Sequence, residues 1–176
     1  MTKKAKEVTV ETANKEVVKE EKKKVIPKLF IGKDEKITVS VVGYHSGETG
    51  ELVLLIPKEL ATEDKENLDN VLIRKEYTFT FTKVTFDKLN RYRNRSMIYN
   101  SQDKNNTING LKLREYFLIF HLVDWNLEDE NGKKIELKFD VNGALSDETL
   151  ELVYSLPSNL LDLVLASYEK RMNISY

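Results

Sequence analysis

Alternation of apolar and polar side chains predicts three β-strands in the first half of the chain. Residues 37–41 alternate apolar with hydroxyl side chains, and residues 77–82 place three aromatic rings on one face and three threonines on the other. Between them lies the short apolar run 52–56. The glycine-rich stretch 43–50 predicts a hairpin or loop between the first two runs. Together these patterns indicate a small antiparallel sheet with one face buried.

From Thr85 onward the apolar period becomes helical. Apolar and aromatic residues recur at spacings of three and four across 86–99, which predicts an amphipathic helix over this segment. A second helix, capped by Thr107 or Asn109, is expected to run to about Val123. Its last turns are apolar on nearly every face, so it should be the central buried helix.

The last third of the chain predicts a turn, a short strand and two more helices. The acidic stretch 124–132 should turn into a strand over 135–139. Ser146 is placed to cap a third helix, and Pro157 fits the first turn of a fourth that runs to about Met172. Strands come first and helices follow, so the expected fold class is α+β, a small antiparallel β-sheet followed by about four helices.

The composition changes near residue 25 and suggests two parts. Residues 1–24 contain eight lysines and five glutamates but no aromatic residue, which predicts a charged N-terminal arm. This arm is either a solvated tail or a segment that orders on a neighbouring subunit. Residues 25–176 are expected to form a single α+β domain, β-rich over 25–84 and mainly helical over 85–176.

Charge and residue usage exclude several function classes. The chain has 28 Lys plus Arg against 29 Asp plus Glu, a net charge of −1, which argues against a dedicated nucleic-acid or membrane binder. There is no cysteine and there are only two histidines, which argues against disulfides, thiol catalysis and the usual zinc sites. No nucleophile motif or phosphate-binding glycine loop is present. We therefore expect no enzyme, no cofactor, no metal and no small-molecule substrate.

The two histidines have different settings. His121 lies in an apolar run, which predicts a core histidine whose hydrogen bonds are satisfied. His45 lies in the glycine-rich stretch, where it is either an ordinary loop residue or a functional one. The basic start of the chain has no apolar stretch of a signal peptide behind it, so a soluble protein made in the cytoplasm is expected.

The sharpest local feature is the arginine-rich segment 88–95. Its candidate interaction residues, together with a tyrosine just beyond it, are Arg91, Tyr92, Arg93, Arg95 and Tyr99. Arginine binds phosphates and tyrosine stacks on bases, so a nucleic-acid site is one interpretation. A solvated or salt-bridged helix face is another. A protein partner is favoured, because Arg and Tyr are common interface anchors.

Three segments that follow one another along the second half of the chain, with a gap over 97–110, resemble one family. The arginine-rich stretch 86–96, the apolar helix 111–123 and the turn 124–135 are similar to small proteins of tailed bacteriophages that are encoded among the head and tail genes. In those proteins an Arg-rich helix precedes an apolar helix that ends in a tryptophan, and a turn of the form Trp-x-Leu-x-Asp-x-x-Gly follows. The resemblance covers about residues 84–170 and does not extend to 29–84.

Trp125 and Gly132 carry the match in that turn and are candidate structural residues. Trp125 is expected to fold back over the buried helix, and Gly132 to supply a positive backbone torsion. The resemblance implies a structural or assembly protein and brings no catalytic residues with it.

The resulting hypothesis is a non-enzymatic structural component of a tailed-phage virion, located in the head, neck or tail. It would be assembled in the host cytoplasm and act through contacts with other phage structural proteins, in many copies. One alternative is a tail-assembly chaperone that binds the tape-measure protein. Another is a nucleic-acid-binding factor that uses the helix at Arg91–Arg95.

Overall fold

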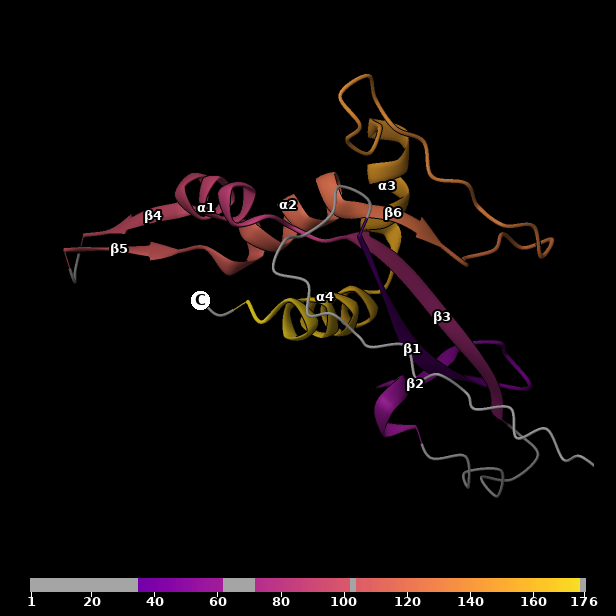
Figure 1. The fold of residues 1–176 in the computed structure, drawn as a ribbon. Helices are drawn as coiled ribbons and strands as arrows, with labels where there is room; N and C mark the ends of the chain where they lie inside the picture. Colours follow the sequence, from indigo (N-terminus) through magenta and orange to yellow (C-terminus); the bar gives the residue numbers. More distant parts are fainter. Residues whose placement is uncertain (1–34, 62–71, 102–103, 175–176) are drawn as a thin grey trace, which may run out of the picture. The chain divides into compact units, whose positions relative to one another are not determined.

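The computed structural model describes residues 35–61, 72–101 and 104–174 (Figure 1). The predicted arm 1–24 and the predicted domain start at residue 25 lie outside the described residues. The strands are β1 (Lys36–Ser46), β2 (Leu52–Pro57), β3 (Leu72–Thr82), β4 (Met97–Asn100), β5 (Asn105–Ile108) and β6 (Leu122–Trp125). The helices are the 3-10 turn η1 (Lys58–Leu60), α1 (Phe86–Arg95), α2 (Gly110–His121), α3 (Asp147–Ser155) and α4 (Ser158–Met172). The α+β class is confirmed.

The main sheet has four antiparallel strands in the order β2-β1-β3-β6. The three strands predicted in the first half of the chain are present as β1, β2 and β3. Both β1 and β3 extend beyond the alternating segments that predicted them. Gly43 was expected in a loop, yet it lies inside β1 opposite Leu55 and Lys75. The position favours glycine, because a Cβ atom there would lie only 2.7 Å from Cε2 of Tyr77 and would clash with the ring.

The core lies between one face of this sheet and the helices. Tyr168 of α4 stacks on Phe81 of β3 with ring centroids 4.6 Å apart, and it meets Phe117 of α2 edge-on at 5.5 Å. The Tyr168 hydroxyl donates to the carbonyl oxygen of Thr82 at 2.8 Å. One tyrosine therefore ties α4 to both β3 and α2.

Burial in β1 corrects the expectation that the sheet buries one face only. Ile37, Val39 and Val41 face the core, as the alternation predicts. Val42 and Tyr44 are buried as well, outside that core. Both faces of β1 therefore carry buried side chains in its second half.

The predicted helix over 86–99 is too long. α1 ends at Arg95, Ser96 follows as its C-terminal cap, and β4 begins at Met97. β4 pairs antiparallel with β5, with Met97 opposite Ile108. Thr107 lies within β5, so Asn109 is the residue that caps α2, and its side chain accepts from the backbone N–H of Lys112 at 3.1 Å.

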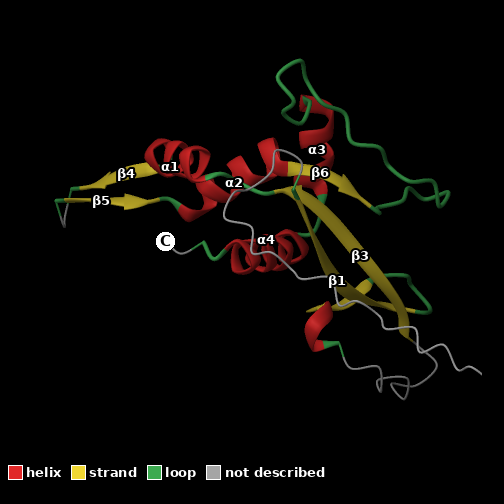
Figure 2. Ribbon diagram, viewed as in Figure 1, coloured by secondary structure: helices red, strands yellow, loops and turns green. Residues whose placement is uncertain are grey.

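The segment between α2 and α3 also differs from expectation. α2 ends at His121, and the next four residues form β6 on the edge of the main sheet. The strand predicted over 135–139 is absent, and this stretch belongs to the long loop between β6 and α3 (Figure 2). Ser146 caps α3 as predicted and accepts from Thr149 N–H, whereas Pro157 directly precedes α4 and does not lie in its first turn.

Candidate protein-interaction surface

α1 divides its side chains between the core and solvent. Thr85 caps its start, Asp87 lies in the first turn, and Arg93 and Arg95 lie in the last turn, where cations complement the helix dipole. Arg91 pairs with Asp87 one turn earlier at 3.0 Å, and both side chains are about 70% exposed. The exposed face of α1 is therefore basic.

Tyr92 lies on the opposite face and corrects the expectation that it belongs to the exposed stripe. It is 7% exposed, and its ring stacks on Tyr116 at 5.1 Å and on Phe120 at 5.9 Å. Burial raises the pKa of its phenol. Tyr92 is a core residue that anchors α1 to α2, and it cannot stack on a base or a partner.

His121 contacts the hydroxyl group of Tyr92 and lies in the core, as the sequence predicts. It is fully buried, with Nδ1 2.8 Å from the Thr82 hydroxyl and Nε2 3.2 Å from the Tyr92 hydroxyl. Burial, with a further contribution from the Lys88 cation, lowers the pKa of His121 from 6.5 to about 4. The neutral imidazole of His121 has a hydrogen-bond partner at each ring nitrogen inside the core. This arrangement suits a structural role rather than proton transfer.

His45 is held in a similar way at the end of β1. Its Nδ1 lies 2.9 Å from the carbonyl oxygen of Gly50, and its Nε2 bonds the hydroxyl of Tyr77. The first contact holds the β1–β2 turn and the second joins β1 to β3, which favours the ordinary interpretation of His45.

β4 and β5 form a hairpin that presents apolar side chains to solvent. Met97 is 47% exposed, Ile98 51% and Tyr99 66%. Among the described residues, neither strand pairs with any other, so each has an open edge. A two-stranded sheet alone is only marginally stable in water, and Ile108 of β5 packs against the core.

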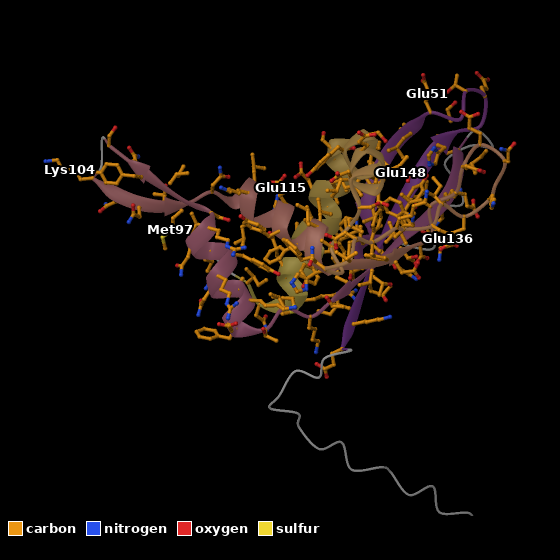
Figure 3. All side chains as sticks on the ribbon, turned by 90° about the horizontal axis from the view of Figure 1, so that it is seen from above. Glu51, Met97, Lys104, Glu115, Glu136 and Glu148 are labelled. Carbon is orange, nitrogen blue, oxygen red and sulfur yellow. The ribbon has the colours of Figure 1, made fainter. Side chains whose placement is uncertain are left out.

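Three of the five predicted interaction residues, Arg91, Arg95 and Tyr99, are exposed. Side chains alternate along β4, so Met97 and Tyr99 point to one face of the strand and Ile98 to the other. Arg91 and Arg95 come from α1, while Tyr99 comes from β4 and not from a helix. Arg93 is half-buried. We define the hairpin surface as Arg91, Arg95, Met97, Ile98 and Tyr99; Figure 3 labels Met97 and Lys104 on this hairpin. Sequence reasoning missed Met97 and Ile98, although the run Met-Ile-Tyr before a polar turn is a strand signal.

Trp125 and Gly132 frame the turn that follows β6. Trp125 is buried on the edge strand, edge-on to Phe79 at 6.2 Å, and its Nε1 donates to the carbonyl oxygen of Ile135 at 2.6 Å. Gly132 has a φ of 75°, the positive torsion predicted for it. The hydrogen bond from Trp125 to Ile135 attaches the loop to β6, and the Trp125 ring packs against Phe79 of β3.

A second concave feature lies where α2 meets α3 and α4. Arg114 of α2 forms two hydrogen bonds with Glu169 of α4, at 3.0 and 2.9 Å, and a third with Asp162 at 3.3 Å. Beside these ion pairs is a mainly apolar groove of about 540 Å³, the α2–α4 groove. Its apolar lining includes Leu111, Leu118, Leu161 and Leu165.

Comparison with known proteins adds no relative. No family model, curated protein or solved structure matches the chain. Within residues 35–61, 72–101 and 104–174, no group of three His, Asp or Glu side chains could hold a metal ion. No helix in that part of the chain is long and apolar enough to cross a bilayer.

Proposed function

We propose that this protein is a non-enzymatic structural component of a tailed-bacteriophage virion, and that it binds its neighbours through the hairpin surface. The observation that carries the proposal is the exposure of Met97, Ile98 and Tyr99 on a two-stranded sheet that pairs with no other strand of the described residues and follows the exposed arginines of α1. Apolar and aromatic side chains with arginine at their border are the composition of protein interfaces.

The phage assignment rests on the resemblance of residues 84–170. That range contains α1 to α4 and the whole hairpin surface. In the turn that carries the match, Trp125 is buried and Gly132 has a positive φ. Both features follow from the residues themselves, so the family assignment rests on the sequence resemblance alone. The structural or assembly role that the resemblance implies is therefore assigned to the part of the chain that holds the exposed hairpin.

Mass spectrometry of purified particles tests the proposal. The chain should be present in a fixed ratio to the other structural proteins of the phage that encodes it. Replacing Ile98 and Tyr99 by serine should leave a folded protein that is lost from particles. The matched control replaces Val53 and Ile73, which are exposed on β-strands elsewhere, and should be incorporated normally. Absence of the unmodified chain from particles would overturn the proposal.

The tail-assembly chaperone is the second candidate, because the structure contains an apolar groove. The α2–α4 groove is large enough for a few apolar side chains of an extended or helical segment, such as one from a tape-measure protein. This function predicts that the chain copurifies with that protein from infected cells and is absent from virions. Leu111→Glu, at a 76% exposed groove residue, should then break the complex.

A further inference from the structure

We propose that the hairpin surface docks onto the acidic segment of a second copy of this chain, so that copies assemble head to tail. We define the acidic segment as residues 124–154, which run from the end of β6 through α3. This inference deepens the proposed function, on which it rests, by naming another copy of the chain as a direct neighbour.

The docking side is basic with an apolar centre. Residues 86–101 contain four cationic residues and a single anionic one. Arg95 and Lys88 are exposed and form no ion pair within the described residues, while Arg91 shares an exposed pair with Asp87. The three consecutive exposed residues of β4 follow this charge directly along the chain, with Met97 and Tyr99 on one face of the strand and Ile98 on the other.

The receiving side has the opposite charge. Residues 124–154 contain nine carboxylates against three lysines. Only three of those carboxylates, at Asp124, Glu128 and Glu148, form ion pairs within the described part of the chain. The other six are Asp129, Glu130, Glu136, Asp140, Asp147 and Glu151. Two of these six, Asp129 and Asp140, accept backbone hydrogen bonds within their own turns. A cationic partner would offset the net negative charge of the segment.

The acidic segment also matches the hairpin in its apolar content. Phe139 is 44% exposed, Val141 fully exposed and Tyr154 55% exposed. An exposed apolar group on each side, bordered by opposite charges, allows both surfaces to lose water while their charges pair.

The two surfaces cannot satisfy each other within one copy. Figures 1 and 3 show the β4–β5 hairpin and the loop with α3 on different sides of the helices, with Met97 and Lys104 far from Glu136 and Glu148. Contact between different surfaces of identical chains is heterologous, so it continues from copy to copy into a ring or a filament.

Nucleic acid fits the same observations less well. Phosphates would neutralise Arg91 and Arg95, but they would leave Met97 and Ile98 in water and give the acidic segment no role. Tyr92, the ring expected to stack on bases, is buried. A protein surface that is both acidic and apolar accounts for all of these features.

Sedimentation of the full chain over a concentration series tests the proposal. The wild type should form oligomers larger than a dimer at high concentration. The association should weaken between about 0.1 M and about 1 M salt, where the Debye length falls from about 10 Å to about 3 Å. A monomer at every concentration in low salt would overturn the proposal.

Charge reversal identifies the surfaces. One variant carries Arg91→Glu and Arg95→Glu, and the other carries Glu136→Lys and Glu151→Lys. Each variant alone juxtaposes like charges, so its apparent dissociation constant should rise at least about tenfold. The control, Lys36→Glu with Lys112→Glu, makes the first variant's charge change at two exposed lysines elsewhere and should assemble like the wild type.

Mixing the two variants is the decisive measurement. In an equimolar mixture, the reversed hairpin of one variant faces the reversed acidic segment of the other, and the two unreversed surfaces also match. Oligomers should therefore return in the mixture, which also shows that both variants are folded. Failure of the mixture to assemble, or wild-type assembly by either variant alone, would overturn the docking.

The assembly experiments in solution and the mass spectrometry of particles test the two proposals separately. A chain that is present in particles but monomeric in solution contradicts only the head-to-tail docking. A chain that assembles as predicted but is absent from particles contradicts only the virion function.

Discussion

The hydroxyl of Tyr92 lies 3.2 Å from Nε2 of His121, and this buried contact joins α1 to α2. The other ring nitrogen of His121 meets the Thr82 hydroxyl at 2.8 Å, so the same imidazole also reaches β3. Because the hairpin follows α1 directly, the contact helps to fix the base from which β4 and β5 extend. Core geometry thereby positions the exposed surface.

Protonation of His121 should destabilise the protein. Its pKa is 6.5 when unperturbed and about 4 in the folded state, because burial disfavours the cation. The unfolded chain therefore binds the proton more tightly between these values, and the free energy of unfolding should fall as the pH drops from 6.5 towards 4. The histidine's contribution to this loss is about 3 kcal/mol.

Chemical denaturation across that pH range, for the wild type and His121→Gln, measures the effect. Carboxylates titrate in both proteins, so the difference between the two profiles isolates the histidine. Profiles that run parallel from pH 6.5 to pH 4 would contradict a buried, neutral His121.

Truncation of the two tyrosines of the arginine-rich region should have unequal effects. Tyr92→Ala removes a ring that is 7% exposed and stacked on two others, so it should cost about 3 kcal/mol or more of unfolding free energy. Tyr99→Ala, at 66% exposure, should change the stability by less than about 0.5 kcal/mol. Equal losses in thermal or urea unfolding would contradict the assignment of one ring to the core and the other to the surface.

The sequence predicts much of this region, and the part it misses has a physical reason. Tyr92 is one helical turn from both Leu89 and Ser96, a spacing that already assigns it to a buried face of α1. Tyr99 continues the same spacing, so the pattern predicts a helix that extends beyond Arg95. What ends it is the pairing of Met97 with Ile108, a contact between residues that are not neighbours along the chain. Local periodicity cannot report such a pairing.

The turn at Trp125 shows the same limit. The positive φ of Gly132 is a local property, and the sequence predicts it. The position of Trp125 depends on β6 joining the edge of β3, where Phe79 is opposite it. The strand expected over 135–139 fails for a related reason: the segment has strand-like residues but finds no strand to pair with. The opposite charges of the hairpin surface and the acidic segment are readable from the sequence, whereas their separation in space is not.

The ion pair between Arg114 and Glu169 should contribute more to stability than the pair between Arg91 and Asp87. The Glu169 side chain is 7% exposed and forms two hydrogen bonds, whereas both partners of the second pair are about 70% exposed. Glu169→Ala leaves a partly buried guanidinium without its main partner and should cost about 2 kcal/mol or more.

Arg91→Ala, the matched control, should cost less than about 0.5 kcal/mol. The double variant Arg114→Met, Glu169→Met should recover part of the loss, because no charge is then left without its partner. Urea unfolding of these variants provides the comparison, and a larger loss for Arg91→Ala than for Glu169→Ala would refute it.

Alanine at Gly132 and at Gly110 should move the stability in opposite directions. A Cβ atom would meet no other atom within 4 Å at either Gly132 or Gly110, so packing contributes to neither change. Gly132 has a φ of 75°, which strains any residue with a Cβ, and Gly132→Ala should cost about 1 kcal/mol. Gly132→Asn should cost less, because asparagine tolerates this region. Gly110 opens α2 without a positive φ, and Gly110→Ala should stabilise the protein by about 0.5 kcal/mol by restricting the unfolded chain. A denaturation midpoint of Gly132→Ala at or above that of the wild type would show that the turn at Gly132 does not require a left-handed residue, and a lower midpoint for Gly110→Ala would contradict the gain predicted there.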